Sequence, residues 1–282
     1  MTTPNRNSKP ETRNSKLVKI TSRDNSLLRR ARAVRDGKIT ESIFIEGLRL
    51  CEEAHVSGLQ IEAVIFSDQI ARKERAASVI EQLSKVAKSS ASVSEKLLES
   101  ISYTRTPQGI VVIAARPSSD ELTFSPKQPA RPLLVVLHEI NNPVNVGAIV
   151  RTAEAAGATG VIATANTADP FSPKSLRGAM GSAFRLPIWS GESYARVLDW
   201  CRSKNAQAIV ADISGTRAYT AVNWRKSSAL IFGRESSGLS PDEIASADQV
   251  VCIPMQGPTE SLNVAVAAGI ILFEAARQRA QN

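Results

Sequence analysis

Residues 133–155 read LLVVLHEINNPVNVGAIVRTAEA, and their pattern indicates the fold of the C-terminal half of the chain. Its first five residues are all apolar, as expected for a strand that is buried on both faces of a parallel sheet. A polar Asn-Pro turn follows, and the residues beyond it have helical spacing. We expect this helix to begin near Asn145, whose side chain is suited to cap it. A buried strand that leads directly into a helix indicates an α/β sheet.

The same alternation of strands and helices extends in both directions. Strands are expected at residues 160–163, 208–211, 229–232 and 250–253, and earlier at 42–45, 63–66 and 110–114. Residues 117–132 carry four prolines, a composition typical of linkers. The sequence therefore predicts an arm at 1–22, a smaller α/β domain at 23–116, a linker at 117–131 and a parallel α/β domain at 132–282.

Basic residues are concentrated at the N-terminus. The chain has a net charge of +8, and residues 1–35 alone hold ten basic and two acidic residues. The polar, aperiodic segment 1–22 predicts a disordered basic arm. We favour an arm that holds nucleic-acid phosphate; a merely solvated tail is a second interpretation, and an organelle transit peptide ranks last.

The overall composition excludes several classes of protein. At 43% hydrophobic and 22% charged residues the chain is typical of globular proteins, and it has no apolar run that could span a bilayer. Its three cysteines and two histidines are a poor set for a disulfide framework or a metal site, so no metal is expected. We interpret Cys51, Cys201 and Cys252 as buried thiols, consistent with a reducing cytoplasm.

Two further segments place polar residues just after predicted strands. Residues 232–240 read FGRESSGLS, in which two glycines permit close approach of a ligand and Glu235 supplies a carboxylate. Residues 253–267 read IPMQGPTESLNVAVA, in which Ser261 and Asn263 either cap the next helix or face a ligand. Each segment alone has an ordinary structural interpretation, but ligands of open α/β sheets bind at these strand ends.

In this order, the three segments resemble the signature motifs of the SpoU (TrmH) family of RNA 2′-O-ribose methyltransferases. The resemblance covers about residues 131–280. The N-terminal half is similar to the substrate-binding domain of many members, an α/β module like RNA-binding ribosomal proteins, with Phe44–Gly47 and Thr106–Gly109 as matching segments. One departure is Asn142, where many members carry Asp.

The resemblance implies a trefoil-knotted, SPOUT-type parallel-sheet methyltransferase domain that uses S-adenosyl-L-methionine. Backbone atoms of Gly233, Ile253 and Leu262 are expected to line the cofactor pocket. The expected polar active-site residues are Asn145, Arg151, Glu235, Ser261 and Asn263. Because a guanidinium stays protonated, we favour Arg151 as a phosphate clamp over a base, with Glu235 orienting it.

The family further implies a homodimer that acts on RNA, with ribosomal RNA favoured over transfer RNA. From the composition and the cysteines we expect a cytoplasmic protein with no membrane partner. Two other functions compete with this one. The first is a non-catalytic RNA-binding or ribosome-assembly protein on the same fold. The second is a small-molecule α/β enzyme that uses a nucleotide, against which the absence of a GxGxxG motif counts.

Overall fold

The structure is a computed structural model that describes residues 17–118, 120, 121, 124 and 131–281. The chain divides into two compact units, Met1–Ala115 and Arg116–Asn282, so the boundary lies next to the predicted domain end at residue 116. Within the described ranges, no helix has both the length and the apolar composition needed to cross a bilayer.

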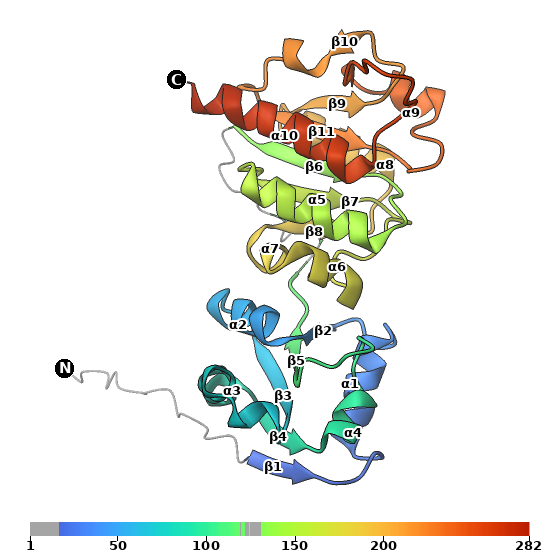
Figure 1. Ribbon diagram of the computed structural model, residues 1–282. Coiled ribbons are helices and arrows are strands. Elements are labelled where there is room, and N and C mark those ends of the chain that lie inside the picture. Colours follow the sequence, from blue (N-terminus) through green and yellow to red (C-terminus); the bar gives the residue numbers. More distant parts are fainter. Residues whose placement is uncertain (1–16, 119, 122–123, 125–130, 282) are drawn as a thin grey trace, which may run out of the picture. The chain divides into compact units, whose positions relative to one another are not determined.

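The first unit is built on a five-stranded sheet in the order β1-β4-β3-β5-β2 (Figure 1). β5 runs antiparallel to β2 and β3, whereas β4 runs parallel to β1 and β3. The strands are β1 (Leu17–Ile20), β2 (Ser42–Glu46), β3 (Ile61–Ser67), β4 (Ser89–Val93) and β5 (Ile110–Ala115). The helices are α1 (Ser26–Arg35), α2 (Leu48–Val56), η1 (Ile70–Arg72), α3 (Glu74–Val86) and α4 (Glu95–Glu99).

Helices cover both faces of this sheet (Figure 1). Leu28, Ala31 and Val34 recur on α1 at helical spacing and pack in one core with strand residues such as Ile65. The intervening strand residues, such as Val64, are buried on the opposite face. Burial on both faces explains why the sequence shows these strands as continuous apolar runs.

The predicted disordered arm is wrong over its last residues. Leu17–Ile20 form β1, which pairs in parallel with β4. Only Ile20 of this edge strand is buried, so the segment carries too little apolar pattern to be recognised from the sequence. Residues 1–16 of the predicted arm lie outside the described residues.

The second unit is built on a seven-stranded sheet in the order β10-β12-β9-β11-β6-β7-β8 (Figure 1). All of its strand pairs are parallel, which confirms the predicted parallel sheet. The strands are β6 (Leu133–Leu137), β7 (Gly160–Ala163), β8 (Ile188–Ser190), β9 (Gln207–Ala211), β10 (Arg217–Ala218), β11 (Ser228–Phe232) and β12 (Gln249–Cys252). The helices are α5 (Pro143–Ala155), α6 (Pro173–Ala179), α7 (Ser182–Arg185), α8 (Tyr194–Ser203), η2 (Tyr219–Ala221), α9 (Pro241–Ala245) and α10 (Val264–Ala280).

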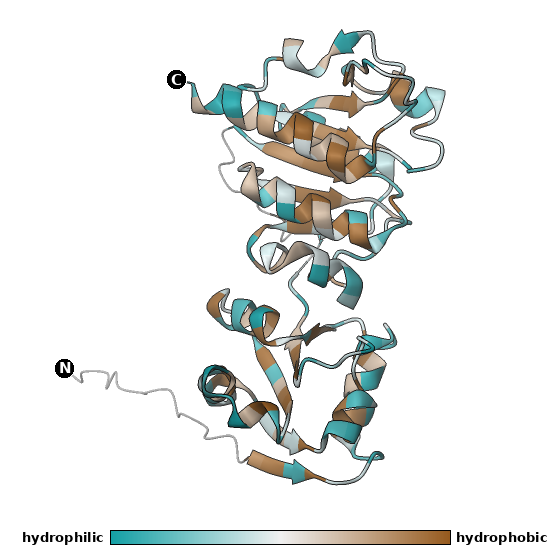
Figure 2. Cartoon of the chain, viewed as in Figure 1, coloured by the Kyte–Doolittle hydropathy of each residue, from teal (hydrophilic) through white to brown (hydrophobic). Residues whose placement is uncertain are grey.

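Apolar residues are concentrated on the central strands of this sheet (Figure 2). β6 and β11 are buried along their whole length. Helices α5 and α10 pack side by side on one face of the sheet (Figure 1). On the other face, Val197 and Cys201 of α8 join a core with alternate residues of β6, β9 and β11. The carboxyl ends of β6, β9, β11 and β12 therefore meet at one edge, where the candidate residues lie.

Part of the predicted linker belongs to the second unit. Phe124 is buried and packs against the rings of Trp189 and Trp200, with ring centroids 6.0 and 5.4 Å away. Arg116, the last residue of the predicted N-terminal domain, also belongs to the second unit, where it pairs with Asp169 and stacks over Phe171. These contacts could not be recognised from the sequence, because the segment's proline-rich composition is typical of a linker. Residues 119, 122, 123 and 125–130 of the predicted linker lie outside the described residues.

Candidate active site

Helix α5 begins with Pro143, and Asn142 rather than Asn145 caps it. The Asn142 side chain accepts a hydrogen bond from the Val144 amide at 3.0 Å, and Pro143 fits the first helical position, where no amide hydrogen is needed. The expectation that Asn145 caps the helix is therefore wrong. Asparagine caps a helix as well as aspartate does, so Asn142 keeps this function without the charge.

Asn145 instead lies buried in the first turn of α5 and joins two loops that are distant in sequence. Its amide nitrogen donates a hydrogen bond to a carboxylate oxygen of Glu235. Its amide oxygen accepts one from the Asn263 side chain at 3.3 Å. Asn263 also caps α10, because its side-chain oxygen accepts hydrogen bonds from the Ala265 and Val266 amides. All three predicted motifs thus meet in one polar cluster.

The loop after β11 is held on its other side by Arg234. Its guanidinium donates to Glu139 at 2.6 Å, to both oxygens of Glu243 at 2.9 and 3.0 Å, and to the Gly238 carbonyl. Gly238 has a φ of 65°, which an L-residue adopts only with strain. Two consecutive residues of this loop therefore have different roles. Arg234 anchors the loop, and Glu235 faces the Asn145 cluster.

Glu243 connects this anchor to the body of the unit. It forms a capping box with Ser240 at the start of α9 and accepts a hydrogen bond from the buried His138 side chain at 2.9 Å. Hydrogen bonds, foremost from Arg234, hold the pKa of Glu243 far below its ordinary value. The carboxylate is therefore charged across the neutral pH range, and the loop is fixed by charge-assisted hydrogen bonds.

A cavity of about 790 Å³ opens beside the Asn145 cluster. It has the size of a small-molecule site, and loops after β9, β11 and β12 form its walls. Seven of the eight residues predicted for the site line it, namely Asn145, Gly233, Glu235, Ile253, Ser261, Leu262 and Asn263. The structure thus brings the predicted cofactor residues and all but one of the predicted polar residues together.

Arg151 is the exception. It lies on α5 two turns from the helix start, is exposed, and does not line the cavity. Glu235, expected to orient Arg151, bonds Asn145 instead. Arg151 follows Val144 by seven residues, so the two share one exposed stripe of the helix.

Residues 211–214, at the end of β9, also line the cavity and were missed from the sequence. Asp212 fixes this turn, because its carboxylate accepts hydrogen bonds from the Ser214 amide and hydroxyl at 2.9 and 2.7 Å. The rule that ligands bind at strand ends would have found Asp212, because it directly follows a predicted strand. Cys252 lines the cavity too and is only half-buried, so its prediction as a buried thiol is wrong, unlike those for Cys51 and Cys201.

The fold and the cavity together define a class of protein: an open parallel α/β protein that binds a ligand at the carboxyl ends of its strands. Comparison with known proteins identifies the family within this class. Residues 132–273 match the SpoU rRNA Methylase family, and residues 27–112 match the MRM3-like substrate binding domain.

Individual relatives support the same family assignment. An uncharacterized tRNA/rRNA methyltransferase of Synechocystis is 32% identical over 94% of this chain and 96% of its own length. The 23S rRNA (guanosine(2553)-2′-O)-methyltransferase RlmP of Bacillus subtilis is 30% identical over 83% of this chain and 88% of its own. The crystal structure of the SpoU methyltransferase AviRb from Streptomyces viridochromogenes with AdoMet superposes with a TM-score of 0.82, at 26% identity, over 92% of this chain and 99% of AviRb.

The chain therefore belongs to the SpoU rRNA methylase family, and it is an RNA ribose methyltransferase that uses S-adenosyl-L-methionine. The cavity fits this cofactor chemically. Ile253, Leu262 and Val264 are partly exposed and offer apolar surface for an adenine ring, and the carboxylates of Asp212 and Glu260 suit a ligand that carries a sulfonium and an ammonium group.

Proposed function

We propose that this chain methylates a ribose 2′-hydroxyl of ribosomal RNA. The observation that carries the proposal is the cluster in which Asn145 joins Glu235 and Asn263 on the wall of one cavity. Relatives named as 23S rRNA 2′-O-methyltransferases support ribosomal over transfer RNA. The MRM3-like match of the N-terminal unit supports a separate role for that unit in holding the RNA.

Gly233, Ile253 and Leu262 are the residues that we propose hold S-adenosyl-L-methionine. A Cβ at Gly233 would collide with Leu239, so this backbone is already packed tightly against the loop that lines the cavity. The bound cofactor supplies a methyl group activated by its sulfonium, so alignment is the main task left to the protein.

The polar cluster is suited to that alignment. Asn145 is held from both sides, so its amide has one orientation and fixes the Glu235 carboxylate at the cavity wall. Ser261 lines the same cavity and is exposed, so its hydroxyl can reach a ribose. We propose that Glu235, Ser261 and Asn263 position the 2′-hydroxyl, and that Arg151 binds a neighbouring phosphate.

A homodimer would explain the position of Arg151. Val266 and Phe273 lie seven residues apart on α10 and are 52% and 54% exposed, and Val144 on the neighbouring helix α5 is 44% exposed. Adjacent helices with apolar residues exposed to solvent are typical of an interface. Because Arg151 shares the stripe of Val144, pairing of two copies through this face would bring Arg151 to the interface.

We also propose that the C-terminal chain forms a trefoil knot. β12 lies between β9 and β10 in the sheet, although it follows both in sequence. The segment 212–216 therefore passes the end of β12, and a Cβ on Gly215 would lie 2.7 Å from the Val251 backbone. This close crossing beside the strand from which the C-terminal chain continues supports threading of that chain through a loop, despite the rarity of knots.

The experiment that tests the function is methyl transfer from labelled S-adenosyl-L-methionine to total RNA, separated afterwards into ribosomal and transfer RNA. We expect label in ribosomal RNA. Label confined to transfer RNA would contradict the proposed substrate. Binding of RNA without transfer and without cofactor affinity would favour the alternative, a non-catalytic RNA-binding or ribosome-assembly protein.

A further inference from the structure

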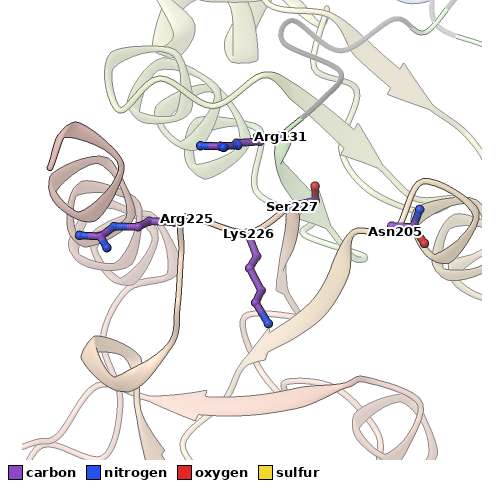
Figure 3. A pocket seen from close by; sticks show the side chains of 5 residues that line it. All are labelled: Arg131, Asn205, Arg225, Lys226 and Ser227. Atoms are coloured by element: carbon purple, nitrogen blue, oxygen red, sulfur yellow. The ribbon is translucent and has the colours of Figure 1, made fainter. Parts of the chain in front are cut away.

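A second, open cavity of about 570 Å³ lies at the opposite end of the sheet from the candidate active site. It is lined by Arg131, Asn205, Arg225, Lys226 and Ser227 (Figure 3). These residues come from segments that lead into β6, β9 and β11, so they lie at the amino ends of the parallel strands. We call Arg131, Arg225, Lys226 and the neighbouring Arg279 the basic cluster.

The backbone under the basic cluster is held by Arg279, which is half-buried at the end of α10. Its guanidinium donates to the carbonyls of Arg131 and Pro132 at 2.9 and 3.2 Å, and to those of Trp224 and Lys226 at 2.7 Å each. One side chain thereby ties together the two segments that carry the three exposed cations. The cations project from a fixed scaffold and do not depend on a flexible loop.

The charge of the basic cluster is not compensated. Among the described residues, none of its four side chains forms an ion pair with a carboxylate, although cations elsewhere on this unit do, for example Arg196 with Glu121. Burial, followed by the repulsion of Arg131, lowers the pKa of Arg279. An uncompensated group of cations on a fixed backbone raises the local concentration of anions.

The neutral residues of the cavity suit the same kind of ligand. Asn205 and Ser227 offer an amide and a hydroxyl beside the cations, and the described residues that line the cavity include no aspartate or glutamate. Lysine, arginine, amide and hydroxyl groups are the side chains that contact phosphate oxygens of nucleic acids. Few apolar side chains are present, which argues against a cofactor ring or a fatty acid.

The basic cluster is separate from the cofactor cavity. β6 has five residues and runs from the basic cluster to His138, so the two ends of the sheet are roughly 17 Å apart at a rise of about 3.3 Å per residue. A group bound at the cluster therefore cannot be the ribose that receives the methyl group. It must be another part of the substrate or another molecule.

We propose that the basic cluster binds the phosphodiester backbone of the RNA substrate at a place remote from the methylated ribose. This proposal rests on the proposed function for its choice of RNA over an acidic protein. Contacts to phosphate fix the position of an RNA without reading its bases. The cluster would therefore add affinity and register, while the cofactor cavity supplies the chemistry.

The test compares two double variants. Arg131→Gln with Lys226→Gln removes the two cluster cations whose side chains form no hydrogen bond with another described residue, and it leaves the backbone carbonyls that Arg279 contacts in place. Arg196→Gln with Arg202→Gln is the matched control, because it removes the same charge from cations of α8 that are already paired with carboxylates. Binding of a labelled, unstructured RNA is measured by fluorescence anisotropy at several salt concentrations, and S-adenosyl-L-methionine binding is measured by calorimetry.

We expect the cluster variant to bind RNA roughly tenfold more weakly at 0.1 M salt, with a salt slope lower by about 1.4, or about 0.7 per lost phosphate contact. The control should keep wild-type affinity, and both variants should keep cofactor affinity. Equal RNA affinity and salt slope in the two variants would overturn the proposal. It would also be overturned if the cluster variant kept its RNA affinity but lost binding of an acidic peptide such as polyglutamate. A wild-type protein that binds RNA but transfers no methyl group would contradict the proposed function alone.

Discussion

Asn142 and Asn145 are the same residue type three positions apart, yet they perform different tasks. Asn142 caps α5, and Asn145 is buried and connects the Glu235 loop to Asn263. The sequence predicts that both belong to one strand-to-helix turn, but capping propensity cannot say which asparagine caps. The difference arises because Pro143 fixes the first helical position, which leaves Asn145 inside the helix and facing the cavity.

These two residues allow a matched comparison. We expect Asn145→Ala to lower kcat roughly a hundredfold, the effect of a small misplacement of reacting groups, because Glu235 loses its partner. Asn142→Ala should instead lower the free energy of unfolding by about 1 kcal/mol, through loss of the cap, with kcat nearly unchanged. Steady-state kinetics and urea unfolding of both variants check this, and a similar kcat for the two variants would contradict it.

Glu243 makes the stability of the active-site loop depend on pH. Its pKa is lowered from 4.5, so its contribution is fully present above pH 4.5 and is lost as the pH falls below that value. We expect Glu243→Gln to reduce the free energy of unfolding by about 2 kcal/mol at pH 7, the size of a hydrogen bond to a charged group. Urea unfolding at pH 7 and pH 3 should show this difference shrinking, whereas a constant difference would count against the assignment.

At the scale of elements, the long apolar runs were predictable and the short or exposed elements were not. β6, β9 and β11 are buried on both faces, so their pattern is visible in the sequence. β1 is an exposed edge strand, and the two residues of β10 are too few to carry a period. The order of the strands comes from tertiary packing, which no local pattern records.

Two glycines in helices should respond in opposite ways to the same substitution. A Cβ at Gly147 of α5 would collide with the Ser175 carbonyl, whereas a Cβ at Gly269 of α10 meets only the Thr152 methyl at 3.8 Å. We expect Gly147→Ala to destabilise the fold by about 1–3 kcal/mol through overpacking. Gly269→Ala should stabilise it by up to about 1 kcal/mol through helix propensity. Thermal unfolding of both variants measures the signs, and two changes of equal sign would contradict this packing.

At the scale of the whole molecule, most of the candidate site was predictable because the three motifs follow three strands of one parallel sheet. The strand-end rule gathers them without any knowledge of the strand order. The strand-end rule does not predict which side chains bond to each other. Glu235 was expected to pair with Arg151, but in the structure it accepts a hydrogen bond from Asn145. Side-chain partners depend on helix rotation, which is set by packing in the folded unit.

The exposed stripe on α5 and α10 predicts that the working unit is a dimer. We expect Val266→Asp with Phe273→Asp to yield monomers by light scattering, because two charges would be buried in the interface. Methyl transfer should fall when dimerisation is lost, while cofactor affinity should fall less. A wild-type chain that is monomeric at micromolar concentration would contradict the proposed dimer.

Ribose methylation by this chain is tested by locating the transferred methyl group on ribosomal RNA. RNA labelled by the wild-type chain is digested with alkali, which cleaves only where the ribose 2′-hydroxyl is free, and the labelled products are sequenced. We expect the label in an alkali-resistant dinucleotide at a single position, and we expect Asn145→Ala to incorporate it roughly a hundredfold more slowly. Label on a base, released by alkali in mononucleotides, would contradict transfer to a ribose 2′-hydroxyl.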